Sequence, residues 1–361
     1  MLQTNLELKA SINEFTAVER ALQGLGFERS IVEQQDRYLL SNGAYVKVRS
    51  NDGNPEALIS YTRQVSPNGR PSNYSNVDIS GLPQLATALE AVADVGLVTK
   101  TRIQFRRNDV IINLDNITDV GCFVEIEVIS DFGDAQYNLD FWISKFYIKP
   151  HEIIPYSNIH LVNMFAASRK FASDSAKGSR KILAVDGSSA SGKSTLKAAL
   201  LANADGKLAY VKRDTTRAPR PDDAISKDYR FVTANDYFES SLLGRYIEFR
   251  DYDFSMSYGV RWAEVRRLTT RGAVPLLLIN LGNGAMVKRL LPDAIVVLLV
   301  ADPDVVEARL RSRGRLREDQ ISERVANASL ASAYAPAYDI VIDTGAQSVN
   351  SIVDRLSKEV A

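Results

Sequence analysis

The feature that most constrains the fold of this chain is a glycine-rich loop, GSSASGKS, at residues 187–194. The loop matches every fixed position of the pattern G-x-x-x-x-G-K-[ST]. The preceding ILAVD is typical of a buried strand, and the following TLKAALLA is typical of a helix. Glycines let backbone N–H groups approach phosphates closely, and a helix start favours negative charge. The loop therefore predicts a phosphate site rather than a simple Gly/Ser turn.

The expected ligand of this loop is ATP with Mg²⁺ or Mn²⁺. Lys193 should reach the β- and γ-phosphates, and Ser194 should ligate the metal. The residues expected to bind the nucleotide are Gly187, Ser188, Ser189, Ala190, Ser191, Gly192, Lys193, Ser194 and Thr195. The chain holds only two histidines and one cysteine, which excludes an intramolecular disulfide and argues against a His-rich metal site and a Ser-His-Asp triad.

The segments around and after the loop predict an α/β domain. Leu276–Asn280 and Ile295–Val300 are continuous apolar strands, as in a parallel sheet that is buried on both faces. Trp262–Arg271, Asp304–Arg313 and Glu318–Leu330 show helical periodicity. Alternation of strands and helices favours a parallel sheet.

The first half of the chain has a different pattern, in which short strands alternate polar and apolar residues. These predicted strands are Asn5–Ala10, Arg37–Ser41, Ala44–Arg49, Ala57–Arg63, Arg102–Arg107, Asp109–Leu114 and Cys122–Ile129, with helices at Glu14–Leu25 and Pro83–Val95. They indicate an antiparallel β-barrel or strongly curved sheet with added helices, an α+β arrangement. A chain of 361 residues suits two domains. We expect domains at residues 1–166 and 181–361, joined by a polar linker at residues 167–180.

A second group of motifs follows the phosphate loop. RDTTRAPRPDD at residues 213–223 and DYRFV at residues 228–232 are similar to the guanylate kinase signature T-T-R-x-P-R-x-G-E and D-Y-x-F-V. YIEF at residues 246–249, SYGV at residues 257–260 and the arginine-rich segment at residues 309–324 also resemble that family. The resemblance covers roughly residues 181–361 and implies a P-loop kinase that acts on a monophosphate.

The family's roles can be carried over to matching positions. The resemblance implies that Arg217, Arg220, Tyr229, Glu248, Tyr258 and Asn280 bind the acceptor. It implies that Lys193, Arg313 and Arg324 stabilise charge on the transferring phosphoryl group. Arginine forks suit these roles because they match phosphate oxygens bidentately.

Several positions depart from the guanylate kinase pattern. Arg213 replaces a serine, Val260 replaces a hydroxyl residue, and Asn280 stands where the family has an aspartate that reads guanine. The valine and the asparagine resemble a sister family, the ribose 1,5-bisphosphate kinases. The acceptor is therefore either a GMP-like nucleoside monophosphate or a ribose phosphate.

Charged residues recur at every second position of the N-terminal strands. Side chains at i and i+2 share a face of a strand, so these charges line the interior if the strands curl, instead of a solvated outer face. The charge pattern and the segments NLELKA, QQDRYL and LDNITDVGCFVEIEV resemble the CYTH family of triphosphate tunnel metalloenzymes. Members include class IV adenylate cyclases and triphosphate hydrolases.

The CYTH resemblance implies that Glu7, Asp115, Glu125 and Glu127 bind metal. It implies that Lys9, Lys47, Arg49, Arg63, Lys100 and Arg102 bind a polyphosphate. Asn5 stands where many members have a glutamate. Ala44 and Ile112 stand where a basic residue is common, which lowers the expected affinity for a full triphosphate.

Two functions remain open at this stage. The first is a bifunctional enzyme, an ATP phosphotransferase that also hydrolyses or cyclises a phosphorylated nucleotide. The second is a kinase regulated by a polyphosphate bound in the tunnel. A formal net charge of zero argues against sequence-specific nucleic-acid binding. The absence of a long apolar run predicts no membrane association and a cytoplasmic location, and the sequence leaves a homodimer open.

Overall fold

The computed structural model describes residues 3–41, 44–62, 70–82, 84, 88–89, 94–129, 135–174, 181–204, 206–220, 223, 227–253, 256–314 and 316–360. The chain divides into two compact units. Unit 1 comprises Met1–Ala166, Thr233–Gly244 and Asp251–Met256, and unit 2 comprises Ala167–Val232, Arg245–Arg250 and Ser257–Ala361.

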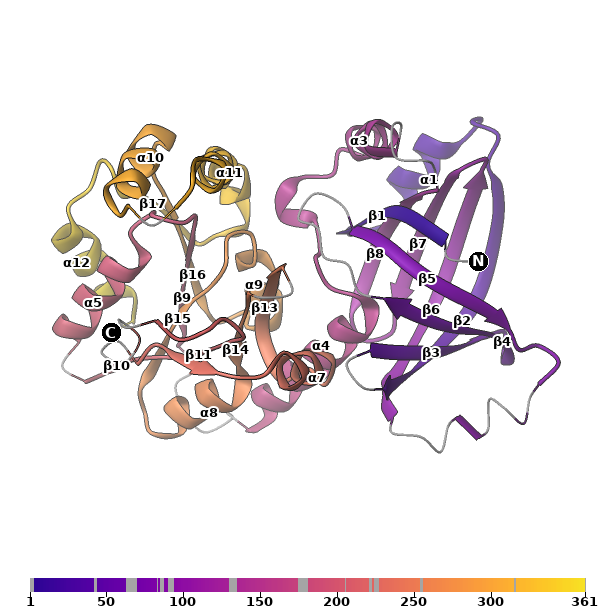
Figure 1. Ribbon diagram of the computed structural model, residues 1–361, viewed down its shortest axis with the longest axis horizontal. Helices are drawn as coiled ribbons and strands as arrows, with labels where there is room; N and C mark the ends of the chain where they lie inside the picture. Colours follow the sequence, from indigo (N-terminus) through magenta and orange to yellow (C-terminus); the bar gives the residue numbers. More distant parts are fainter. Residues whose placement is uncertain are drawn as a thin grey trace. The chain divides into compact units, whose positions relative to one another are not determined.

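Unit 1 is built on a closed antiparallel barrel with the strand order β1-β5-β4-β3-β2-β6-β7-β8 (Figure 1). Its strands are β1 (Gln3–Ser11), β2 (Glu28–Ser41), β3 (Ala44–Asn51), β4 (Asn54–Thr62), β5 (Arg70–Asp78), β6 (Asp94–Arg107), β7 (Val110–Ile117) and β8 (Gly121–Val128). Alternation along the strands sends one set of side chains into the barrel and the other outward. The prediction of an antiparallel barrel is confirmed.

The outward face of β1, β6, β7 and β8 forms an apolar core with helices α1 (Thr16–Leu22) and α3 (Ala135–Lys145). Leu139 and Trp142 of α3 pack there beside Ile112 and Ile126 of the barrel. The 3₁₀ segment η1 (Pro150–Glu152) and helix α4 (Asn158–Asp174) follow. Because the apolar side chains of these strands point outward to the helices, the barrel interior is lined by polar side chains.

Several elements of this half differ from the sequence prediction. The predicted linker begins inside α4, because residues 167–174 are helical, and residues 175–180 lie outside the described part. Residues 94–95 of the predicted Pro83–Val95 helix belong to β6, where burial in the barrel outweighs helical spacing. β5, α3 and α4 were not predicted.

Unit 2 holds a five-stranded parallel sheet with the order β10-β15-β9-β16-β17. Its strands are β10 (Leu208–Tyr210), β15 (Val274–Leu278), β9 (Leu183–Gly187), β16 (Ile295–Val300) and β17 (Ile340–Asp343). The predicted α/β domain with a parallel sheet is confirmed. A second sheet, β12-β11-β14-β13, consists of β11 (Arg213–Thr215), β12 (Tyr229–Phe231), β13 (Tyr246–Asp253) and β14 (Met256–Arg261).

Helices pack on both faces of the parallel sheet. α5 (Lys193–Asn203) and α12 (Val349–Val360) cover one face through Leu196, Leu200 and Leu356, while α8 (Trp262–Thr270) and α9 (Gly284–Leu290) contact β15 and β16. α10 (Pro303–Ser312), α11 (Glu318–Ser329) and the 3₁₀ segment η2 (Ala331–Ala337) follow β16 (Figure 1). The central strands are apolar throughout because both of their faces are covered.

One helix of the second half groups with unit 1. α7 (Ala234–Leu242) lies in the segment Thr233–Gly244, which belongs to the same compact unit as the barrel. Within the described residues, no helix is both long and apolar enough to cross a bilayer.

Candidate active site and polyphosphate tunnel

The phosphate loop joins β9 to α5, as its sequence predicts. Gly187 has a φ of 151°, and a Cβ there would lie 2.5 Å from Oγ of Ser191 and 2.7 Å from the carbonyl oxygen of Leu299. Gly192 is left-handed with a φ of 97° and forms the N-cap of α5. Both positions therefore require glycine.

The side chains of the loop are arranged to receive anionic groups. Lys193 donates from Nζ to the carbonyl oxygens of Gly187 and Ser188, the latter at 2.7 Å. Burial lowers the pKa of Lys193 to about 8. Oγ of Ser191 is buried and has no hydrogen-bond partner among the described residues, whereas Ser194 and Thr195 are exposed at the start of α5. An unsatisfied hydroxyl beside a buried ammonium group fits a phosphate, and the exposed Ser194 fits a metal ion that accompanies it.

Arginines from the α10–α11 region reach the same loop. Arg324 donates from Nη1 to Oγ of Ser189 at 2.9 Å, and Arg309 donates from Nη1 to the carbonyl oxygen of Ala190 at 3.1 Å. Arg313 is exposed at the end of α10, and its charge contributes to the lowered pKa of Lys193. The structure thus brings Arg313 and Arg324 to the loop and adds Arg309.

The predicted acceptor residues gather on the second sheet. Arg217 forms a bidentate pair with Asp223, with both distances 2.7 Å, and its guanidinium lies 4.7 Å from the ring centre of Tyr229. Tyr229 and Tyr258 contact each other with ring centroids 5.9 Å apart. Arg220 is exposed beside Asp223 and donates its backbone N–H to that carboxylate. Aromatic rings beside a fixed guanidinium suit recognition of a phosphorylated ligand.

Glu248 lies at the centre of a polar cluster. It is fully buried and accepts from Nη2 of Arg213 at 3.2 Å, from Nδ2 of Asn280 at 3.0 Å and from Nδ2 of Asn283 at 2.6 Å. Burial raises the pKa of Glu248, and the charge of Arg213 opposes that rise. Glu248 and Asn280, which were both predicted to bind the acceptor, therefore contact each other. Asn283 was missed, although it lies three residues after the end of the predicted strand Leu276–Asn280.

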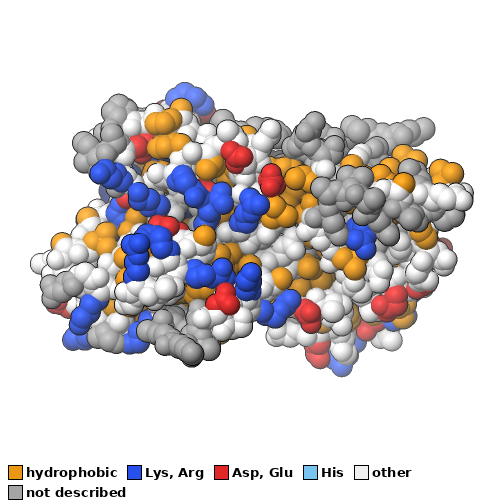
Figure 2. All heavy atoms as spheres, turned by 90° about the horizontal axis from the view of Figure 1, so that it is seen from below, with side chains coloured by type: hydrophobic (Ala, Val, Ile, Leu, Met, Phe, Trp, Pro, Cys, Tyr) orange, Lys and Arg blue, Asp and Glu red, His pale blue; other side chains and the backbone are white. Residues whose placement is uncertain are grey.

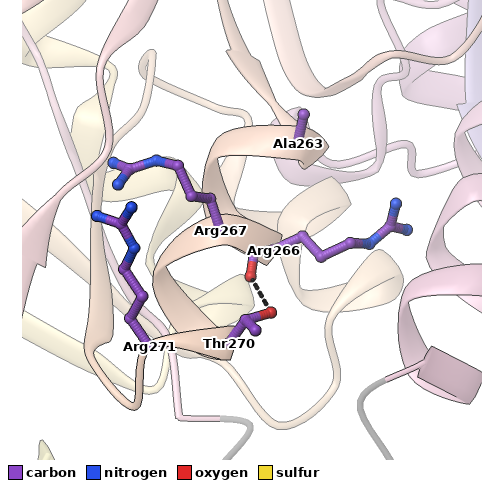
Figure 3. A pocket seen from close by; sticks show the side chains of 5 residues that line it. All are labelled: Ala263, Arg266, Arg267, Thr270 and Arg271. Atoms are coloured by element: carbon purple, nitrogen blue, oxygen red, sulfur yellow. Dashed lines mark hydrogen bonds between the residues drawn. The ribbon is translucent and has the colours of Figure 1, made fainter.

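A basic surface on α8 is a weaker candidate site. Figure 2 shows Lys and Arg side chains gathered on a face of unit 2, and a shallow pocket on α8 is lined by Ala263, Arg266, Arg267, Thr270 and Arg271. In Figure 3, Arg266 points away from Arg267 and Arg271, so the three guanidinium groups do not converge on one ligand position. The phosphate loop therefore remains the stronger candidate for the active site.

The barrel interior gathers the charges predicted for it. Asp115 is fully buried and accepts from Lys100 at 2.8 Å and from Nε of Arg102 at 2.6 Å. Glu125 pairs with Lys9 at 3.1 Å and with Nη2 of Arg102 at 2.7 Å. These charges lie inside the barrel rather than on a solvated outer face, as the alternation predicts.

A second interior cluster surrounds Asp36. Its carboxylate accepts from Lys47 at 3.1 Å and from Nε of Arg49 at 2.7 Å. Burial would raise the pKa of Asp36, but Lys47 and Arg49 hold it well below its usual range. Burial lowers the pKa of Lys47 to about 7. Asp36 was not assigned a role from the sequence, although it lies in the family-like segment QQDRYL. Arg63 lies outside the described residues.

The carboxylates predicted to bind metal are engaged by protein groups. Glu7 and Glu127 are direct cross-strand neighbours, and Glu127 accepts from Nδ2 of Asn113 at 2.8 Å. Burial raises the pKa of Glu127, and the nearby Glu125 raises it further. Within the described part of the chain, no group of three or more acidic, histidine or cysteine side chains is arranged to hold a metal ion. Asp115 lies near Glu125, but Nη2 of Arg102 bridges the two carboxylates at 2.7 Å from each.

Together, the fold and the loop define a P-loop phosphotransferase domain that follows a charged tunnel. A guanylate kinase family model matches residues 179–360, about half of the chain, and a CYTH domain model matches residues 3–138. The chain belongs to the guanylate kinase family and carries an N-terminal CYTH domain. Both resemblances seen in the sequence are confirmed.

Individual relatives each cover half of this chain or less. A guanylate kinase from Rubrobacter xylanophilus is 35% identical over 150 residues, which is 41% of this chain and 77% of the relative. One from Lactobacillus delbrueckii subsp. bulgaricus is 30% identical over 174 residues, covering 47% and 85%. A crystal structure of guanylate kinase from Anaplasma phagocytophilum is 22% identical, covers 50% of this chain and 83% of its own, and has a TM-score of 0.38.

Proposed function

We propose that unit 2 transfers a phosphoryl group from ATP to a nucleoside monophosphate or a ribose phosphate. The observation that carries this proposal is the ammonium group of Lys193, which lies inside the loop and donates to the carbonyl oxygens of Gly187 and Ser188. ATP with Mg²⁺ would supply the transferable phosphoryl group and part of the charge neutralisation. The residues of the loop would hold the metal–nucleotide complex through Lys193 and Ser194.

The protein's contribution would be positioning and charge stabilisation. Lys193, Arg313 and Arg324 would lie around the transferring group, while Arg217 and Tyr229 would hold the acceptor's phosphate. Arg217 is already fixed by its bidentate pair with Asp223. Such preorganisation accounts for most catalysis of phosphoryl transfer, which needs no nucleophilic side chain.

The acceptor remains one of the two classes predicted from the sequence. Guanine recognition by Glu248 would require the base to displace Asn280 or Asn283, which now donate to that carboxylate. Leaving a buried donor without its acceptor costs about 1–3 kcal/mol. Any acceptor that contacts Glu248, whether a nucleotide or a ribose phosphate, must offset this cost.

The test is turnover of ATP with a panel of nucleoside monophosphates and ribose phosphates, with products identified by phosphorus NMR. Lys193→Ala should lower turnover by a factor of about 10²–10³ because a charge stabiliser is lost. Lys358→Ala, which removes an exposed lysine from α12, is the matched control. Wild-type turnover in Lys193→Ala would refute the kinase assignment.

For unit 1, we propose metal-dependent hydrolysis or cyclisation of a phosphorylated nucleotide. The buried cations Lys9, Lys100 and Arg102 support binding of a polyphosphate. Because their partners are internal carboxylates, a ligand must compete with existing ion pairs. A metal that arrives with the ligand would be held by Glu7, Glu125 and Glu127. Glu125 would then exchange its ion pairs with Lys9 and Arg102 for contacts with the metal.

One observation favours the alternative, in which the tunnel only binds a polyphosphate and regulates the kinase. α7, which lies inside the guanylate kinase match, groups with the barrel, and Phe238 of α7 stacks on Tyr45 of β3 with ring centroids 6.3 Å apart. Tyr45 contacts Tyr38, whose ring lies 5.8 Å from Nζ of Lys47 in the tunnel. A path of contacts therefore leads from the tunnel to a kinase-family helix.

Substituting both Glu125 and Glu127 by glutamine separates the two functions. Loss of a hydrolytic or cyclase activity, with kinase kinetics intact, supports a second enzyme in the chain. A change confined to the kinase kcat or KM supports the regulatory alternative.

A further inference from the structure

Asp186 is a buried carboxylate that the proposed phosphoryl transfer does not use. It lies in β9, directly before the phosphate loop, and is fully buried. Its Oδ1 accepts from the backbone N–H of Gly187 at 2.5 Å. Its Oδ2 accepts from the backbone N–H of Gly284 at 3.2 Å and from the hydroxyl of Tyr338. The carboxylate therefore connects the start of the donor loop to the start of α9.

Asn283, which precedes Gly284, contacts the polar cluster around Glu248. Asn283 is 2% exposed and donates from Nδ2 to Glu248 at 2.6 Å. Two consecutive residues thus contact two buried carboxylates, Asp186 beside the donor loop and Glu248 in the acceptor cluster. We call the set Asp186, Tyr338, Gly284, Asn283 and Glu248 the Asp186–Glu248 network.

The middle of this network has no free space. The ring of Tyr338 packs so closely on Gly284 that a Cβ there would lie 2.2 Å from Cε1 of the tyrosine. The hydroxyl of Tyr338 also accepts from the N–H of Gly284 at 3.2 Å. In close packing of this kind, a shift of the Asn283–Gly284 segment cannot be absorbed locally and must move its partners.

We propose that Asp186 is a positioning residue, and that the Asp186–Glu248 network couples the acceptor pocket to the donor phosphate loop. This inference rests on the proposed assignment of the two pockets. An acceptor that contacts Glu248 competes with Asn283 and shifts the Asn283–Gly284 segment. The shift changes the hydrogen bonds of Asp186, and with them the orientation of the Gly187 N–H at the mouth of the loop.

The electrostatics of Asp186 agree with a positioning role. Burial raises its pKa to about 6, against the opposing effects of Tyr338 and Lys193. A raised pKa means that ionised Asp186 lowers the stability of the folded chain at neutral pH. A carboxylate retained at such a cost is typical of a functional region.

The test is amide hydrogen exchange in the ligand-free full chain, read by peptide. Glu248→Gln should speed exchange about tenfold in the peptide that covers residues 183–192, and Asp186→Asn should do so in the peptide that covers residues 280–287. Asp78→Asn is the matched control, because Asp78 is an exposed carboxylate that also accepts from a backbone N–H, at 2.9 Å, but lies in unit 1, outside the network. It should change neither peptide.

Changes confined to the peptide that carries each substitution would overturn the coupling. Because no substrate is present, this result is independent of whether the chain shows kinase turnover. If Glu248→Gln or Asp186→Asn does not fold, the milder pair Asn283→Ala and Tyr338→Phe provides the same reciprocal comparison.

Binding of a fluorescent ATP analogue adds a functional readout. Asp186→Asn and Glu248→Gln should each lower the affinity. The loss in the double variant should differ by about threefold or more from the product of the two single losses. If the losses of affinity are additive and each substitution changes exchange only in its own peptide, Asp186 stabilises the fold but does not couple the two pockets.

Discussion

At the scale of single residues, Lys47 makes polyphosphate binding in the tunnel pH-dependent. Its pKa in the free protein is lowered to about 7 by burial and by Arg49. A bound polyanion raises that pKa, so binding above pH 7 must take up a proton, and affinity falls by about tenfold per pH unit. Titration with inorganic tripolyphosphate between pH 7 and 9 measures this slope.

Lys47→Arg is the control for that slope, since arginine keeps its charge throughout the range. The wild-type affinity should fall more steeply with pH than that of the variant, and this comparison removes the ionisation of tripolyphosphate itself. Parallel pH profiles would contradict a role for Lys47 in holding the anion.

Gly284 provides a prediction about stability. Gly284→Ala places a Cβ 2.2 Å from the ring of Tyr338, and overpacking of this kind costs about 1–3 kcal/mol. Gly81→Ala is the control, because a Cβ at that position meets nothing within 4 Å. Urea denaturation should show the loss for Gly284→Ala only. An equal, small effect in both variants would mean that the Tyr338 ring moves aside without cost.

The sequence predicts residues of the site better than it predicts their partners. Lys193, Arg217 and Glu248 could be assigned because fixed motifs carry them. Arg213 and Asn283 could not be given roles, since their contacts with Glu248 depend on how β11, β13 and the segment after β15 approach one another. Such long-range proximity leaves no local periodicity in the sequence.

At the scale of elements, the segment that follows α7 is fixed to α4 by close backbone packing. Gly244 has a φ of 62°, and a Cβ there would lie 2.5 Å from the backbone of Asn163. Asn163 also donates from Nδ2 to the carbonyl oxygens of Leu242 at 2.6 Å and Val95 at 3.2 Å. Gly244→Ala should therefore destabilise unit 1.

Gly24→Ala is the matched control for this substitution, because Gly24 also belongs to unit 1. Gly24 has a φ of 75°, but a Cβ there meets nothing within 4 Å. Both variants suffer left-handed strain of about 1 kcal/mol, so the additional loss in Gly244→Ala measures the contact with Asn163. Equal denaturation midpoints for the two variants would show that α7 is not held against α4.

The sequence predicted helices and strands correctly where a strand is covered on both of its faces. Ile295–Val300 was predicted with the bounds of β16, because a strand covered on both faces is apolar throughout. α7 and α9 were missed because each is short, and α9 begins at a glycine that tertiary packing requires. Local propensity is too weak to define such helices without their neighbours.

At the scale of the whole molecule, the sequence predicted two domains, yet the grouping of α7 with the barrel could not be foreseen. The motifs on either side of α7, TTRAPR and YIEF, indicated one continuous kinase domain. The order of motifs along the chain follows the kinase family, whereas the packing of α7 places it in the compact unit of the barrel. The chain therefore has two compact units, and the boundary between them differs from the boundary of the kinase family match.

Two compact units, each with its own proposed anion site, predict two ligand-specific stabilities. A ligand at 100 times its Kd stabilises the unit that binds it by about 2.7 kcal/mol. Tripolyphosphate should thus protect peptides of unit 1 from hydrogen exchange, and ATP with Mg²⁺ should protect peptides of unit 2. Lys193→Ala should remove the protection by ATP and leave that by tripolyphosphate, because Lys193 belongs to the phosphate loop alone. If the variant loses both, one anion site serves both ligands, and the tunnel is not an independent polyphosphate site.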